Sequence, residues 1–236
     1  MDEQLDYGST RNFYRSRLLK SCYQEINYKI ISFFGQLDTN LSILDVGCGD
    51  GFFLSILRDL GFLNIKGIDL SEAFIMKCRK KGLIVDKKDF LTYADEKYDI
   101  ILMIELLEHT KEPELFLNKA RFLLNTRGKI LLTVPVFDSI YEKYLRLRTG
   151  LNRLEQLQEL DNAHLQAFNR KSMEHLVRRN GKFRIIVCEH FYNLLHPRLE
   201  ILLGKKAASF INQITFFNHF GDWLLMILEK DSQKSI

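Results

Sequence analysis

The chain has 236 residues, with 34 Lys and Arg against 30 Asp and Glu, and its formal net charge is therefore +4. Hydrophobic residues make up 46% of the sequence and charged residues 27%, which excludes a disordered chain and is typical of a globular protein. The basic residues form only short runs, and this argues against nucleic acid as a partner. The length suits one domain with a real core.

The cysteines and the N-terminal residues indicate a cellular compartment. The cysteines stand at positions 22, 48, 78 and 188, which matches neither a disulfide framework nor a paired metal knuckle. The first residues are charged and include no apolar segment of the kind that a secretory signal requires. No apolar run approaches the ~18 residues that cross a bilayer. We therefore expect a cytoplasmic protein with reduced thiols and no transmembrane segment.

Residues 1–135 predict helices and strands in alternation. Apolar residues three and four positions apart predict a helix within residues 1–40. Short apolar runs predict strands at residues 42–46, 64–68, 83–86, 98–104 and 129–134. Helices are expected between them at residues 52–60, 71–81 and 112–125. This alternation implies an α/β fold, in which a doubly wound, mostly parallel sheet carries helices on both faces.

Beyond Pro135 the pattern is less regular. Residues 138–160 and 172–180 have helical patterns, and residues 182–189 and 223–228 are predicted strands. An insert rich in aromatic residues separates these two strands and has no clear period.

The most specific motif is a glycine-rich turn between the first strand and the helix that follows it. The turn reads LDVGCGDG over residues 44–51, with glycines at positions 47, 49 and 51. Glycine permits backbone angles and a close approach of a ligand that a Cβ atom would block. Asp69 ends the next strand, where a carboxylate can accept hydrogen bonds from ribose hydroxyls. The turn therefore predicts a nucleoside site at the carboxyl edge of the sheet.

The spacing of the glycines distinguishes between two kinds of nucleotide ligand. A dinucleotide fold requires G-x-G-x-x-G, whereas the third glycine here comes one residue early. Asp45, just before the turn, would repel a pyrophosphate but suits a ligand that carries an amino group and a sulfonium. An NAD-dependent oxidoreductase is therefore the weakest alternative.

With Asp45, the three glycines and Asp69, the sequence resembles the class I S-adenosylmethionine-dependent methyltransferases. Its pattern is nearest to small-molecule O-methyltransferases of the ubiquinone-pathway type. The resemblance covers residues 40–135 closely and the rest loosely. It implies a Rossmann-like seven-stranded sheet in the order 3-2-1-4-5-7-6, with an antiparallel seventh strand. It also implies S-adenosylmethionine as the cofactor and S-adenosylhomocysteine as its product.

The resemblance also implies which residues contact the cofactor. They are Asp45, Gly47, Cys48, Gly49, Gly51, Phe52, Asp69, Leu70, Asp89, Phe90, Ile104 and Glu105. Asp45 would face the methionine amino group, and Asp69 would hold the ribose hydroxyls. Asp89 would meet the adenine amino group while Phe90 packs on the ring. The family often has glycine where Arg127 stands, which we interpret as a harmless departure.

One methyltransferase domain is expected over residues 1–236. Its parts are an N-terminal helical cap (1–40), a cofactor-binding core (41–135), a helical lid (136–165) and an acceptor-side half (166–236) that contains the insert 191–221.

The candidate chemistry follows the fourth strand, in the segment Glu105-Leu-Leu-Glu108-His109. If the segment forms a helical turn, its three polar side chains share one face. Three interpretations stay open. The residues shape the pocket without chemistry, or His109 acts as a general base beside Glu108, or the segment binds a divalent metal.

The metal interpretation draws on the resemblance. Similar ExxEH segments occur in ubiquinone-pathway O-methyltransferases and in small-RNA 2′-O-methyltransferases, where they can bind magnesium or a related ion that orients the acceptor oxygens. His164 stands where the RNA enzymes have a further histidine. The implied ligands are Glu105, Glu108, His109 and His164. The same motif also occurs in methyltransferases with no known metal.

The acceptor is the least determined part of the prediction. Residues 191–221 suit a lipid-like acceptor, a peripheral membrane contact, a homodimer face or an ordinary core. We expect methyl transfer to an oxygen of a small or lipid-linked metabolite. The alternatives are an RNA 2′-O-methyltransferase with a Glu/Glu/His metal site and a cofactor-binding subunit without turnover.

Overall fold

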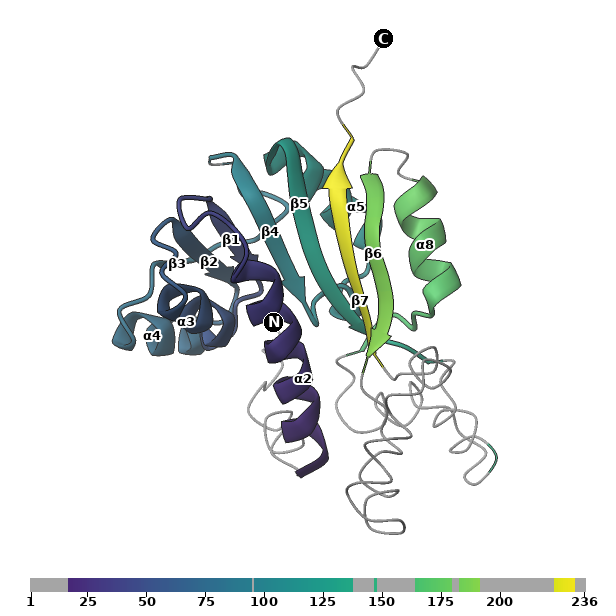
Figure 1. Cartoon of the computed structure of the whole chain (residues 1–236), viewed down its shortest axis with the longest axis horizontal. Coiled ribbons are helices and arrows are strands. Elements are labelled where there is room, and N and C mark those ends of the chain that lie inside the picture. Colours follow the sequence, from purple (N-terminus) through teal and green to yellow (C-terminus); the bar gives the residue numbers. More distant parts are fainter. Residues whose placement is uncertain are drawn as a thin grey trace, which may run out of the picture.

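A central β-sheet organises the chain, and the computed structural model describes residues 17–94, 96–137, 147, 164–179, 183–191 and 223–231. Seven strands in these residues pair in the order β3-β2-β1-β4-β5-β7-β6 (Figure 1). They are β1 Ile43–Val46, β2 Ile65–Asp69, β3 Val85–Lys87, β4 Tyr98–Ile104, β5 Leu124–Pro135, β6 Phe183–Phe191 and β7 Trp223–Lys230. Strands β1 to β5 are parallel, whereas β7 is antiparallel to β5 and β6. The expected fold class and strand order are confirmed.

The helices begin where the local chemistry supports them. They are α2 Arg17–Phe34, α3 Phe52–Asp59, α4 Glu72–Lys80, the 3-10 helix η1 Leu107–His109, α5 Pro113–Leu123 and α8 Arg170–Arg179. The Ser71 hydroxyl caps α4 by accepting a hydrogen bond from the Phe74 N–H at 3.4 Å. Pro113 occupies the first turn of α5, where its missing N–H leaves no hydrogen bond unmade.

Helices cover both faces of the sheet. On one face, Ile30 of α2 and Leu57 of α3 pack with Leu102 of β4 in one buried cluster. On the other face, Leu117 of α5 and Met173 of α8 are buried in a second cluster. Figure 1 shows α2 in front of the sheet and α5 behind it. Burial on both faces explains why the central strands are continuous apolar runs.

Two strands begin two or more residues away from their predicted starts. The third strand begins at Val85, because Leu83 lies in the turn that closes α4, where its N–H donates to the Cys78 carbonyl at 3.1 Å. The fifth strand begins at Leu124, which pairs with Tyr98 before an irregularity leads to the regular register. Arg127 lies in this irregularity with a φ of 61°. A non-glycine residue is strained in that conformation, so the departure from the family glycine affects the backbone.

Several predicted features lie wholly or mostly outside the described residues. These are the helix over 138–160, most of the lid over 136–165 and nearly all of the insert over 191–221. Among the described residues, no helix has the length and apolar character needed to cross a membrane.

Candidate functional site

The glycine-rich turn connects the end of β1 to the start of α3. Gly49 has a φ of 53° and Gly51 a φ of 76°, both in the left-handed region that favours glycine. A Cβ atom on Gly51 would lie 2.4 Å from Cδ1 of Leu83, whereas one on Gly49 would meet nothing within 4 Å. Packing therefore requires Gly51, while the space beside Gly49 can admit a ligand.

Asp69 holds the turn in place from the neighbouring strand. Its Oδ2 accepts a hydrogen bond from the Gly49 N–H at 2.9 Å, and its Oδ1 accepts one from the Ser71 N–H at 2.8 Å. A carboxylate has about four acceptor positions, so both oxygens retain capacity for ribose hydroxyls. The acidic residue at the end of β2 thus shapes the glycine turn in addition to the ligand role expected of it.

Asp45 is a buried carboxyl group on β1, only 2% exposed. Burial, with a smaller contribution from the charge of Asp69, raises the pKa of Asp45 to about 7. Its Oδ2 has no hydrogen-bond partner among the described residues. A buried, unsatisfied carboxyl oxygen beside a glycine turn fits the cationic amino group of S-adenosylmethionine.

The other expected cofactor residues differ in their surroundings. Cys48 is buried with Leu54 and Cys78 in a small cluster beneath the turn, so its side chain belongs to the core. Phe90 is also buried and packs against Phe116, with ring centroids 5.6 Å apart. The remaining side chains lie at the surface or at the sheet edge: Phe52 and Leu70 are exposed, Asp89 is exposed and accepts from the Leu91 N–H, and Ile104 ends β4. Their contacts with a cofactor stay predictions.

The ExxEH segment forms a tight turn directly after β4. Glu108 lies in η1 with a side chain that is 0% exposed, and its two carboxyl oxygens have no hydrogen-bond partner among the described residues. Burial raises the pKa of Glu108 well above its usual range, and the nearby charge of Glu105 adds to the effect. A buried carboxyl group without hydrogen bonds is costly unless it serves a ligand.

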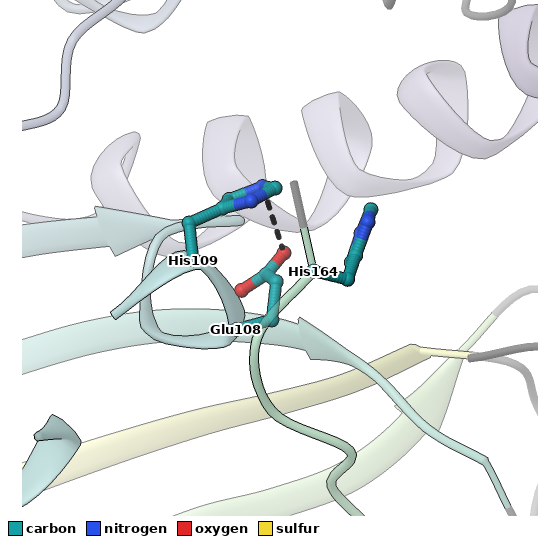
Figure 2. A group of neighbouring side chains, drawn as sticks. All are labelled: Glu108, His109 and His164. Carbon is teal, nitrogen blue, oxygen red and sulfur yellow. Dashed lines mark ion pairs between the residues drawn. The ribbon is translucent and has the colours of Figure 1, made fainter. Parts of the chain in front are cut away.

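Two imidazoles meet this carboxyl group. Nε2 of His109 lies 3.9 Å from Oε1 of Glu108, and the rings of His109 and His164 have centroids 4.7 Å apart. Figure 2 shows His109 and Glu108 from one short turn and His164 from the segment before α8. One potential ligand atom from each residue lies within 4.8 Å of the others. The structure thus brings together three of the four expected metal ligands.

The backbone of Glu108 also holds the segment that carries His164. Its carbonyl oxygen accepts hydrogen bonds from the N–H groups of Leu165, at 2.8 Å, and Gln166, at 3.0 Å. The same residue therefore provides a carboxyl group to the cluster and a backbone anchor for the histidine beside it.

The fourth expected ligand, Glu105, lies outside the cluster. Its carboxylate accepts hydrogen bonds from the Thr133 hydroxyl, at 2.8 Å, and from the Trp223 indole N–H, at 2.7 Å. From the sequence, Thr133 and Trp223 are predicted only as strand residues, with no role at the site. The expected adjacency of the fourth, fifth and seventh strands was the signal for this contact, because the three side chains come from these strands or their ends.

Comparisons with known proteins indicate the family of the chain. Residues 14–186 match the family described as "Methyltransferase domain". The mitochondrial ubiquinone biosynthesis O-methyltransferase of Candida albicans is 34% identical over 139 residues, which are 50% of this chain and 42% of that protein. A ubiquinone biosynthesis O-methyltransferase of Hydrogenovibrio crunogenus is 30% identical over 132 residues, 51% of this chain and 54% of that protein. The chain spans about half the length of these curated relatives.

The fold is similar to that of solved methyltransferase structures. A SAM-dependent methyltransferase from Archaeoglobus fulgidus superposes with a TM-score of 0.65 at 18% identity, covering 96% of this chain and 100% of that one. At this identity the likeness establishes the shared fold.

Proposed function

The chain belongs to the methyltransferase domain family, and from that premise we propose that it transfers the methyl group of S-adenosylmethionine to an oxygen of a small or lipid-linked acceptor. The observation that carries the proposal is the cluster of Glu108, His109 and His164. Glu108 and His109 follow β4, the strand that pairs with β1 before the glycine turn. A cofactor cradle and a group of acid–base and ligand side chains thus meet at one edge of the sheet.

The cradle supports the cofactor part of the proposal. S-adenosylmethionine supplies an electrophilic methyl group on a sulfonium when it is bound. Asp69 binds the ribose hydroxyls, Asp45 receives the amino group, and the open space at Gly49 admits the ligand close to the backbone. Gly47, Gly51, Phe52, Leu70, Asp89, Phe90 and Ile104 complete the proposed contacts, with Cys48 contributing its backbone.

The cluster supports the acceptor part. His109 is partly exposed, so its imidazole can take the proton of an acceptor hydroxyl, and the buried Glu108 orients it. A divalent ion bound by Glu108, His109 and His164 would lower the pKa of that hydroxyl instead. One carboxylate and two imidazoles suit Mn²⁺ or Zn²⁺ better than Mg²⁺, which prefers oxygen ligands.

The relatives support an oxygen acceptor. Both curated relatives are named as O-methyltransferases of ubiquinone biosynthesis. The comparisons give no support to an RNA 2′-O-methyltransferase or to a cofactor-binding subunit without turnover. A cytoplasmic location, a homodimer and a membrane contact through residues 191–221 stay predictions.

Calorimetric titration with S-adenosylhomocysteine tests the cofactor part, and methyl transfer from labelled S-adenosylmethionine tests the acceptor part. We expect micromolar binding of the nucleoside and labelled product from phenolic or catecholic acceptors but not from an RNA oligonucleotide. EDTA, followed by Mn²⁺ or Mg²⁺, separates a metal role from a base role of His109. Absence of nucleoside binding in every condition would overturn the proposal.

A further inference from the structure

Glu105 is held in an unusual backbone conformation at the end of β4. Its φ is 51°, which strains a residue that carries a Cβ atom. Its N–H donates to the Thr133 carbonyl at 3.1 Å. Strain of this kind persists only where the surrounding structure over-determines it, and it concentrates at ligand-binding sites.

The surrounding structure determines the side chain of Glu105 as well. The Thr133 hydroxyl, on β5, donates to Oε1 at 2.8 Å, and the Trp223 indole, at the start of β7, donates to Oε2 at 2.7 Å. Because each carboxylate oxygen has its own donor, both the position and the rotation of the group are fixed. Thr133 is fully buried and Trp223 is nearly so, which keeps these donors from moving away.

Glu105 follows the strand that pairs with β1, and the glycine turn follows β1. Strands β1 and β4 are paired, with Asp45 opposite Leu102. Directly after Glu105, the Leu106 side chain meets the turn, since a Cβ atom on Gly47 would lie 2.9 Å from Cδ1 of Leu106. Glu105 therefore follows a strand that borders the proposed cofactor site.

The order of strands orients the ligand in that site. Asp69, the proposed ribose partner, ends β2, and the glycine turn follows β1, the next strand. A ligand that extends from Asp69 across the turn reaches β4 with its methionine end. The sulfonium would then lie between the ribose and the cluster of Glu108, His109 and His164, on the side where Glu105 is held.

We propose, on the basis of the function proposed above, that Trp223 and Thr133 are positioning residues that hold the Glu105 carboxylate against the sulfonium of S-adenosylmethionine. The two acids of the ExxEH segment then have separate tasks. Glu108 joins the two histidines, while Glu105 supplies a fixed negative charge to a cationic ligand.

The test compares two ligands that differ in this charge. S-adenosylmethionine carries the sulfonium and S-adenosylhomocysteine does not, whereas both carry the amino group. We expect Glu105→Gln to weaken binding of S-adenosylmethionine about tenfold more than binding of S-adenosylhomocysteine, as measured by calorimetry. The exposed Glu112→Gln is the matched control and leaves both affinities unchanged.

The positioning residues are tested by removing single donors. Trp223→Phe keeps an aromatic ring but removes the indole N–H. Thr133→Val keeps the size of the side chain but removes the hydroxyl. Each should reduce the preference for S-adenosylmethionine over S-adenosylhomocysteine, as Glu105→Gln does. Thr133→Ser retains the hydroxyl and should restore the preference, which a merely structural role would not require. If Trp223→Phe does not fold, as judged by circular dichroism, the comparison of Thr133→Val with Thr133→Ser still tests the proposal.

Other outcomes count against the proposal. If Glu105→Gln weakens the binding of both ligands equally, the carboxylate contacts the amino group that they share. If neither affinity changes, the carboxylate does not contact the ligand. Either result overturns this inference while leaving the proposed function intact. A wild-type chain that binds neither nucleoside refutes the proposed function itself.

Discussion

Asp69 and Gly49 are joined by a hydrogen bond of 2.9 Å from the glycine N–H to the carboxylate, so the acid that ends β2 also shapes the turn after β1. One side chain thereby couples two adjacent strands at the edge where the ligand is expected. A change at Asp69 would therefore act on the turn as well as on the proposed contact with the ribose.

We expect Asp69→Ala to weaken binding of S-adenosylhomocysteine by about 100-fold or more, because two charge-assisted hydrogen bonds to the ribose are lost. Calorimetry measures the affinity, and thermal unfolding checks that the fold survives. Asp86→Ala, on the neighbouring β3, is the control and keeps full affinity. Unchanged affinity in Asp69→Ala would exclude the ribose assignment.

Gly49 and Gly82 form a matched pair for the turn. Both have a left-handed φ, 53° and 71°, and a Cβ atom on either would meet nothing within 4 Å. Gly49→Ala and Gly82→Ala should each reduce the free energy of unfolding by about 1 kcal/mol through backbone strain. Only Gly49→Ala should lose nucleoside binding in calorimetry. Equal affinity in both variants would show that the space beside Gly49 takes no ligand.

The pKa of Asp45, raised to about 7, gives ligand binding a pH dependence. In the proposed contact the ligand amino group binds the charged carboxylate, so a proton on Asp45 would compete with the ligand. The affinity for S-adenosylhomocysteine should rise by up to about tenfold per pH unit from about pH 5 to 7, and then level off. Asp45→Asn removes this rise. A flat profile in the wild type would contradict the proposed contact.

The unliganded chain should show the opposite trend in stability. The folded state favours the protonated form of Asp45, since the pKa rises from 3.8 to about 7 on folding. This stabilising contribution is fully present below about pH 4 and is lost as the pH rises through about 7. Denaturant unfolding of the wild type and of Asp45→Asn isolates the contribution as the difference between their pH profiles. Parallel profiles would mean that Asp45 titrates alike in both states.

Titration of the protein with a metal ion tests the cluster of Glu108, His109 and His164 as a metal site. We expect Mn²⁺ to bind the wild type, and we expect Glu108→Gln or His164→Asn to reduce the affinity for Mn²⁺ by at least about tenfold. Glu105→Gln should retain the ion, because its carboxylate is bonded elsewhere. Glu108→Gln should not destabilise the metal-free chain, since it removes a buried carboxyl group that accepts no hydrogen bond from the described residues. Identical metal affinities in all variants would exclude a metal site at this cluster, and His109 as a general base would be the interpretation that is left.

Arg127 offers a test that is independent of ligands. Because its φ is 61°, Arg127→Gly should increase the free energy of unfolding by up to about 1 kcal/mol, as measured in denaturant. Arg127→Ala retains a Cβ atom and should bring no such gain. A loss of stability in the glycine variant would mean that contacts of the arginine side chain outweigh the strain.

The sequence predicts most of the fold because its signals are local. The run Tyr98–Ile104, the glycine turn and Pro113 each define an element through neighbouring residues. Leu83 is misplaced because a buried leucine serves a helix end as well as a strand. The early start of β5 depends on pairing with Tyr98, which no pattern within β5 reveals.

The sequence predicts the residues of the site better than it predicts the hydrogen bonds between them. Glu108, His109 and His164 are nominated by motif, and the structure brings them together. The bonds of Glu105 to Thr133 and Trp223 depend on the spatial order of three strands, so spacing along the chain does not indicate them. The ExxEH motif therefore identifies Glu105 and Glu108 as candidates but does not indicate that the two side chains have different partners.

The chain is anchored where it departs after β5 and where it returns before α8. Val136 and Phe168 form an isolated bridge, and the Phe137 N–H donates to the Phe168 carbonyl at 2.9 Å. Both contacts are made by described residues on either side of positions 138–163. Evolution can lengthen, shorten or exchange that segment while Glu108 and His164 stay together. If that segment contacts the acceptor, as predicted for the lid over residues 136–165, its exchange would alter acceptor preference without a change in the cluster.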